Sequence, residues 1–78
     1  MAGESKLTVK QIEAKTGLSA STIHYYTALE LLRAAGRKGS ARLYPARLTM
    51  ERLKRIRTLL ERGHSLAGIK DSLSRDER

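Results

Sequence analysis

The 78-residue chain lacks cysteine, phenylalanine and tryptophan, and it contains a single proline and three tyrosines. The absence of cysteine excludes disulfide bridges and thiolate metal sites. Because aromatic residues are few, leucine and isoleucine must build the core, and a chain this short buries only about 60% of its unfolded surface. One domain with a thin core and no roomy substrate cavity is therefore expected.

Long hydrophobic stretches are also missing. No apolar run approaches the roughly 20 residues that a membrane-spanning helix needs. The N-terminus has no apolar block of the kind found in secretory signals. The sequence therefore predicts a cytoplasmic protein that does not engage a membrane.

The residue patterns of catalytic and metal sites are absent as well. His24 and His64 lie far apart in the sequence, and neither has a carboxylate at ligand spacing. The chain has no set of nucleophile, base and orienting residue, no paired carboxylates and no glycine-rich phosphate loop. We expect neither an enzyme nor a bound metal or cofactor.

Basic residues exceed acidic ones by 16 to 8, and the excess is confined to one part of the chain. Residues 1–30 carry three of each sign, residues 64–78 also carry three of each, and residues 31–63 carry ten basic and two acidic groups. Such a concentration of like charge costs self-repulsion, which a polyanion would relieve. Nucleic acid fits this charge; an anionic membrane or an acidic protein would use it in the same way.

Helix caps stand out in the first third of the sequence. Thr8 and Gln11 have capping-box spacing, which predicts a helix beginning at Val9. Gly17 is suited to end that helix, and Ser19 is a good N-cap for the next. Two short helices joined by a glycine-containing turn form a helix-turn-helix.

The second helix is predicted over about residues 20–28. Helical periodicity turns Ile23, Tyr26 and Thr27 inward. The outer face is then polar and uncharged, and it consists of Ser21, His24, Tyr25 and Ala28.

The rest of the chain reads as a hairpin followed by two helices. Residues 33–35 and 41–44 flank a basic tip at residues 36–40. Pro45 is suited to the first turn of a third helix, which we expect to run to about Arg62. Gly63 then ends that helix, and Ser65 caps a last helix with an apolar stripe of Leu66, Ile69 and Leu73.

These elements carry motifs that resemble the DNA-binding domain of MerR-family regulators. The first half is similar to that family in Thr8-Val9-x-x-Ile12, Thr16-Gly17-Leu18-Ser19, Thr22-Ile23-x-Tyr25-Tyr26 and Leu31-Leu32. The second half is similar in Arg42-Leu43-Tyr44 and in Ile56-x-x-Leu59-x-x-x-Gly63-x-Ser65-Leu66-x-x-Ile69. The family often has arginine at positions 21 and 24 and glutamate at position 27, where this chain has Ser21, His24 and Thr27.

The resemblance implies a mainly α fold, a winged helix-turn-helix with about four short helices and a two-stranded β-hairpin wing over residues 7–73. Residues 1–6 and 74–78 are expected to be flexible. The implied function is sequence-specific binding of double-stranded DNA, as the reading domain of a bacterial transcription regulator at the nucleoid. We expect a longer parent protein to form a homodimer and this chain to be a monomer.

Three groups of candidate DNA contacts follow. For base reading in the major groove, the helix at residues 20–28 and its cap offer Ser19, Ser21, Thr22, His24 and Tyr25. For phosphate or minor-groove contact, the wing offers Arg37, Lys38, Arg42 and Tyr44, with Arg42 and Tyr44 expected to point outward. For contact to phosphates, the third helix offers Arg47, Arg52 and Arg55.

Two other interpretations remain open from the sequence. A winged-helix module could use the same basic surface to bind an acidic or DNA-mimicking protein. A natural protein of this size could also be a phage DNA-binding protein of the excisionase or terminase type.

Overall fold

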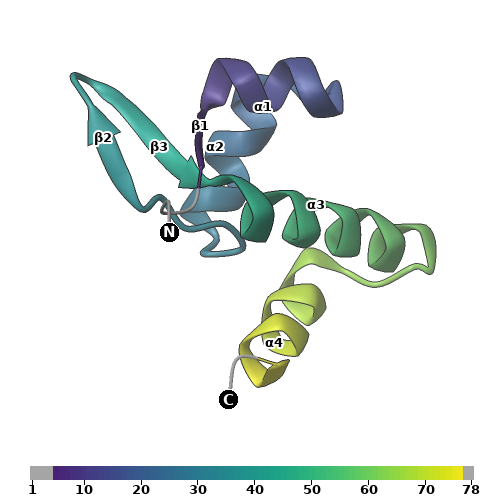
Figure 1. Cartoon of the computed structure of the whole chain (residues 1–78). Coiled ribbons are helices and arrows are strands. Elements are labelled where there is room, and N and C mark those ends of the chain that lie inside the picture. Colours follow the sequence, from purple (N-terminus) through teal and green to yellow (C-terminus); the bar gives the residue numbers. More distant parts are fainter. Residues whose placement is uncertain (1–4, 77–78) are drawn as a thin grey trace.

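The fold begins with two short helices joined by a three-residue turn. The computed structural model describes residues 5–76. Helix α1 (Val9–Thr16) and helix α2 (Ala20–Ala28) are joined by residues 17–19, as the sequence predicts (Figure 1). Strands β2 (Gly36–Lys38) and β3 (Ala41–Pro45) form the wing, and helices α3 (Ala46–Glu61) and α4 (Leu66–Asp76) complete the domain.

Side-chain caps fix the bounds of the first two helices. The Thr8 hydroxyl accepts a hydrogen bond from the Gln11 backbone at 3.2 Å, and the Thr8 amide donates to the Gln11 side chain at 2.9 Å, which confirms the capping box. Gly17 has a φ of 79°, the left-handed conformation that ends α1. Ser19 caps α2 by accepting from the Thr22 amide at 3.1 Å.

A carboxylate of α1 adds a further bond to this turn. Glu13 Oε2 accepts a hydrogen bond from the Ala20 amide at 3.0 Å, so α1 satisfies one of the free amides at the start of α2. An anionic acceptor at a helix N-terminus also interacts favourably with the helix dipole. Glu13 therefore helps to fix the angle between the two helices.

The wing hairpin is tighter than predicted. Lys38 pairs with Ala41, so the tip is only Gly39 and Ser40, and Gly39 takes a φ of 63°. Residues 33–35, predicted as the first strand, precede β2 instead, although the Ala35 amide still donates to the Leu43 carbonyl at 2.7 Å. Arg37 and Lys38, predicted in the loop, are therefore strand residues with defined directions.

The sheet has one more strand than predicted. Strand β1 (Lys6–Thr8) pairs antiparallel with β3 and places Leu7 opposite Tyr44, which gives the order β1-β3-β2. A strand of three residues is too short to show period-two alternation, and its bonds go to residues far along the chain. The predicted mainly helical winged fold is confirmed, and its wing belongs to a three-stranded sheet.

Helix α3 ends and helix α4 begins at the predicted residues. Gly63 has a φ of 91° after the end of α3, and the Ser65 hydroxyl accepts from the Gly68 amide at 3.1 Å at the start of α4. Helix α4 runs to Asp76, and Lys6 already belongs to β1. Of the segments predicted to be flexible, residues 1–4 and 77–78 lie outside the described residues.

The segment between α2 and the wing is held from two sides. Arg52 of α3 donates through Nη1 to the Leu31 carbonyl at 3.2 Å. Lys70 of α4 lies 3.4 Å from a carboxylate oxygen of Glu30. The segment that follows α2 therefore contacts both C-terminal helices.

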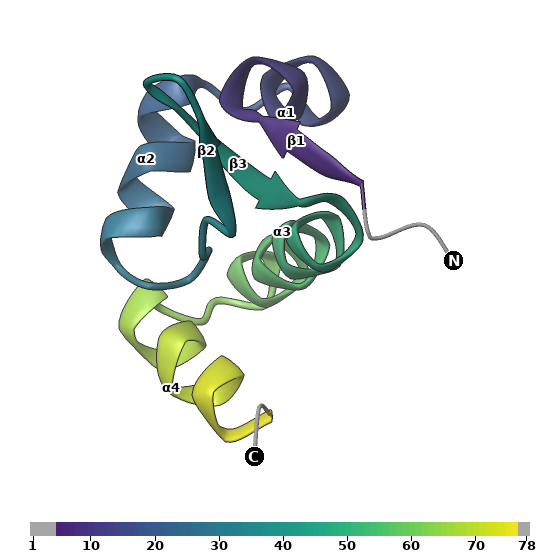
Figure 2. The same cartoon turned by 60° about the vertical axis from the view of Figure 1, so that its left-hand side comes forward.

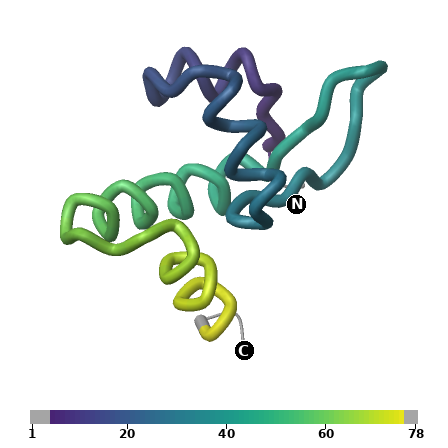
Figure 3. Tube along the Cα trace, turned by 180° about the vertical axis from the view of Figure 1, so that it is seen from behind, coloured from purple at the N-terminus to yellow at the C-terminus, as the bar shows by residue number. Residues whose placement is uncertain are grey.

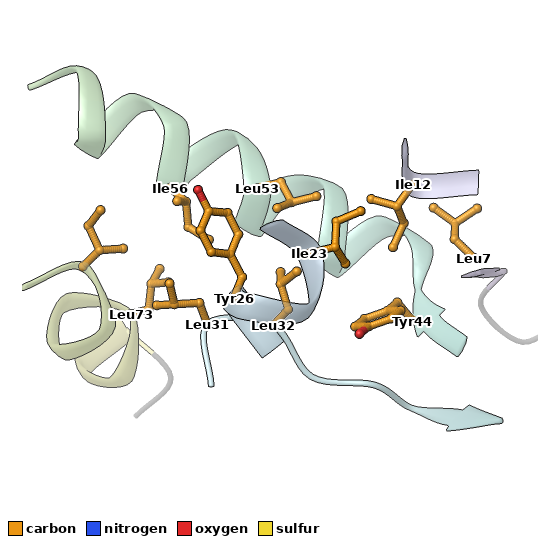
Figure 4. Packing of buried hydrophobic residues seen from close by; sticks show 11 residues of the cluster. Leu7, Ile12, Ile23, Tyr26, Leu31, Leu32, Tyr44, Leu53, Ile56 and Leu73 are labelled. Carbon is orange, nitrogen blue, oxygen red and sulfur yellow. The ribbon is translucent and has the colours of Figure 1, made fainter. Parts of the chain in front are cut away.

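The core forms one continuous row between the sheet and α4. In Figure 4, Leu7 and Tyr44 lie at one end, Ile23 lies in the middle and Leu73 lies at the other end. Each fully buried Leu or Ile side chain stabilises the fold by about 1.5–3 kcal/mol. The buried apolar side chains are Leu7, Ile12, Ile23, Tyr26, Leu31, Leu32, Tyr44, Leu53, Ile56, Ile69 and Leu73.

The cap of α2 generates a stability prediction. Ser19→Ala removes the acceptor for the Thr22 amide and should cost about 1 kcal/mol. For a domain of this size, that loss lowers the melting temperature by about 4–8 °C in a thermal scan followed by circular dichroism. Ser21→Ala, at an exposed position of the same helix, is the control and should leave the melting temperature nearly unchanged. Equal melting temperatures for both variants would contradict the role of Ser19 as a cap.

Candidate nucleic-acid interface

The outer face of α2 is exposed, polar and free of charged side chains. Ser21, His24, Tyr25 and Ala28 are all exposed, and Tyr25 keeps 53% of its surface accessible. Their predicted outward orientation is confirmed, as is the inward orientation of Ile23 and Tyr26. A slim helix with such a face suits a major groove, where hydroxyl, imidazole and phenol groups reach base edges.

Two of the five candidates on this helix have a bond within the fold. The hydroxyls of Ser19 and Thr22 lie 3.0 Å apart, and Ser19 also accepts the Thr22 amide. Their first role is to cap the helix, so Ser21, His24 and Tyr25 are the members of the predicted set that are most available for contact.

The wing carries three exposed cations, Arg37, Lys38 and Arg42. Arg37 lies directly opposite Arg42 in the antiparallel register. Like charges at directly opposed positions destabilise a β-ladder. Within residues 5–76, none of these three side chains forms an ion pair with a carboxylate. An anion beside the wing would relieve this repulsion.

The expected outward orientation of Tyr44 is wrong. Its side chain is fully buried, at 0% exposure, opposite Leu7 of β1. Arg42 and Tyr44 are two residues apart on one strand, so they share a face of the sheet. That face is open to solvent at the wing and is covered by the core at Tyr44, because β1 joins β3 only at residues 43–45.

Tyr44 instead joins the wing to helix α2. Its phenol oxygen lies 2.8 Å from the Thr27 hydroxyl, which also donates to the Ile23 carbonyl at 2.9 Å. A hydroxyl has only one proton, so Thr27 accepts from Tyr44. The bond links the inner side of α2 to strand β3, so it connects the elements that carry the two predicted contact surfaces.

The three arginines predicted on α3 differ in their surroundings. Arg47 Nε lies 3.5 Å from Glu51, and both side chains are largely exposed. Arg52 is half-buried and donates to the Leu31 carbonyl, as described above. Arg55 is exposed. Arg52 thus has a structural role that the sequence did not indicate, and contact of any of the three with phosphate stays a prediction.

A hollow of about 470 Å³ lies between the two predicted contact surfaces. It is lined by residues from the start of α1, from α2 and from the tip of the wing: Thr8, Val9, Lys10, His24 and residues 40–42. We call it the wing hollow. The hairpin projects away from the helices in Figure 3, and Figure 2 shows it turned forward, in front of α2.

Lys10 is a residue that the sequence analysis missed. It is exposed on the first turn of α1 and lines the wing hollow together with Arg42. One signal was present in the sequence: a cation in a first turn opposes the helix dipole, which favours negative groups there. Helix α1 has no acidic residue in its first turn to offset it.

Residues 5–76 contain neither a candidate metal site nor a candidate membrane span. No group of three His, Cys, Asp or Glu side chains is placed to hold a metal ion among them. None of the helices described is both long and apolar enough to cross a bilayer.

The exposed helix α2 and the basic hairpin beside it define a winged helix-turn-helix domain. Residues 7–76 match the family model described as MerR HTH family regulatory protein. The chain therefore belongs to the MerR helix-turn-helix family, and membership implies DNA-binding transcriptional regulation. No curated protein and no solved structure matches the chain.

The bond between Thr27 and Tyr44 generates a second prediction. Thr27→Val keeps the shape of the side chain and leaves the buried Tyr44 hydroxyl without its acceptor. The free energy of unfolding, measured with urea, should fall by about 1–3 kcal/mol. Tyr44→Phe removes the other partner. If the bond forms as described, the double variant should be clearly more stable than the sum of the two single losses indicates. Strictly additive losses would show that the two hydroxyls do not interact.

Proposed function

We propose that this domain binds double-stranded DNA sequence-specifically, as the DNA-reading part of a bacterial transcription regulator acting in the cytoplasm at the nucleoid. Helix α2 enters the major groove, and the wing contacts the adjacent backbone or minor groove. One observation carries the proposal: an exposed, uncharged polar helix face lies beside a hairpin with three unneutralised cations.

The distribution of ion pairs supports a contact between the wing and the DNA backbone. On α3, two exposed arginines have acidic neighbours one turn away, Arg47 with Glu51 and Arg57 with Glu61 at 3.4 Å. The wing has no acidic residue in either strand. The three cations of the wing therefore have no acidic neighbour on their own strands, and the wing is the part of a winged domain that meets the DNA backbone.

Base discrimination falls to α2 on chemical grounds. Ser21, His24 and Tyr25 offer short, directional hydrogen bonds and an aromatic edge, which distinguish one base pair from another. They add little long-range attraction, since the helix carries no fixed charge. Affinity then depends on the wing, and sequence preference depends on the helix.

Binding to duplex DNA should be strongly salt-dependent. The logarithm of the association constant should fall linearly with the logarithm of salt concentration, with a slope of about 0.9 per phosphate neutralised. Fluorescence anisotropy with a labelled duplex measures this slope. A dissociation constant of micromolar order is expected for one small module. A binding constant that does not change with added salt would refute the electrostatic part of the proposal.

Variants of the wing and the helix should affect different quantities. Arg42→Ala should weaken specific and random duplexes by similar factors and reduce the salt slope by about one. Tyr25→Ala should reduce the difference in affinity between the selected and the random duplex and leave the salt slope nearly unchanged. The selected duplex comes from enrichment of bound sites in a random library.

Arg57→Ala is the matched control for charge, because Arg57 is exposed on α3 and already paired with Glu61. It should have a smaller effect than Arg42→Ala. The reverse pattern, with specificity lost at Arg42 and uniform weakening at Tyr25, would mean that the wing reads the site and α2 anchors the domain.

A further inference from the structure

The wing hollow brings together polar groups from three elements that are distant in the sequence. Lys10 comes from α1, His24 from α2, and Ser40 and Arg42 from the wing. The turn at residues 17–19 and the Thr27–Tyr44 bond hold these elements at fixed positions. These four polar side chains therefore lie close together in the absence of a bound partner.

The charge of the hollow has one sign. Its two ionisable side chains of fixed sign, Lys10 and Arg42, are both basic, and no carboxylate is among its lining residues within the described chain. Lys10 also lies at the positive end of the α1 dipole, where a cation is disfavoured. One anion placed between Lys10 and Arg42 would offset the like charge of these two side chains. It would also offset the unfavourable position of Lys10 at the positive end of the helix dipole.

The size and the apolar part of the hollow favour a phosphodiester over a small free ion. The hollow is open to solvent, and its volume of about 470 Å³ leaves room for more than a single phosphate group. Val9 and Ala41 add apolar surface to the lining, which is suited to the carbon atoms of an adjoining sugar.

We infer that the wing hollow binds one phosphodiester group of the DNA backbone between the Lys10 ammonium and the Arg42 guanidinium, with Ser40 and His24 as hydrogen-bond partners. The inference rests on the proposed function and adds Lys10, outside the reading face and the wing, to the DNA contacts. A phosphate fixed at this point sets the angle at which α2 enters the groove, since backbone contacts position a domain on the duplex.

The first test compares two lysines of the same helix. Lys10→Gln should weaken duplex binding about five- to tenfold at 0.1 M salt and lower the salt slope by about 0.9, as expected for one lost phosphate contact. Lys15→Gln removes the same charge from the exposed last turn of α1, does not line the hollow, and should have a much smaller effect. Lys10→Arg should retain most of the affinity, because it preserves the charge.

The second test uses the wild-type chain without DNA. Dimethyl phosphate and inorganic phosphate are titrated separately while backbone amide shifts are recorded by NMR. Dimethyl phosphate should shift the amides of Lys10, His24, Ser40 and Arg42 more than those of Lys54 and Arg57 on α3. A response to inorganic phosphate alone would replace the phosphodiester assignment by a free-anion site.

The outcomes separate this inference from the proposed function. If the wild-type chain binds duplex DNA and Lys10→Gln equals Lys15→Gln, the hollow does not hold a backbone phosphate, whereas the proposed function stands. If the wild-type chain does not bind duplex DNA, the proposed function fails, and the titration alone decides whether the hollow takes a phosphodiester. Shifts spread evenly over all exposed basic residues would overturn the inference.

Discussion

The hydrogen bond from Tyr44 to Thr27 is the constraint on which the arrangement of the interface depends. It joins the inner side of α2 to strand β3 and provides the partner of the fully buried Tyr44 hydroxyl, so breaking it leaves that hydroxyl without a partner. The wing projects beyond this point and lines the hollow. The bond therefore links the two elements to which the proposed function assigns the DNA contacts.

Electrostatics divides the surface into two kinds of region. Acidic residues lie one turn from arginines on α3 and α4 and neutralise part of their charge. The wing and the hollow contain cations without such neighbours, including the opposed pair Arg37 and Arg42. The domain tolerates this repulsion because the wing is well solvated, where like charges cost little. The same charges become favourable beside a polyanion, which is the physical basis for the proposed DNA contact.

Three residues of α2 differ from what the family resemblance implies, since Ser21 and His24 stand where it implies arginine and Thr27 stands where it implies glutamate. Thr27 forms the bond to Tyr44. His24 lines the wing hollow together with Lys10 of α1 and Arg42 of the wing. The basic side chains of this hollow are therefore supplied by α1 and the wing, whereas α2 itself contains no Lys or Arg.

The sequence by itself determined the helices, because their limits depend on contacts between residues three or four apart. Thr8, Gly17, Ser19 and Ser65 each end or begin a helix at the predicted place. The family motifs likewise identified the fold, and helical periodicity identified the exposed face of α2. Only the tertiary structure decided the direction of Tyr44, the third strand and the neighbourhood of Lys10. Each depends on contacts between residues that are distant in the sequence, which local spacing does not encode. Alternation along β3 places Arg42 and Tyr44 on the same face of the sheet. The pairing of β1 with β3 then decides which part of that face is buried.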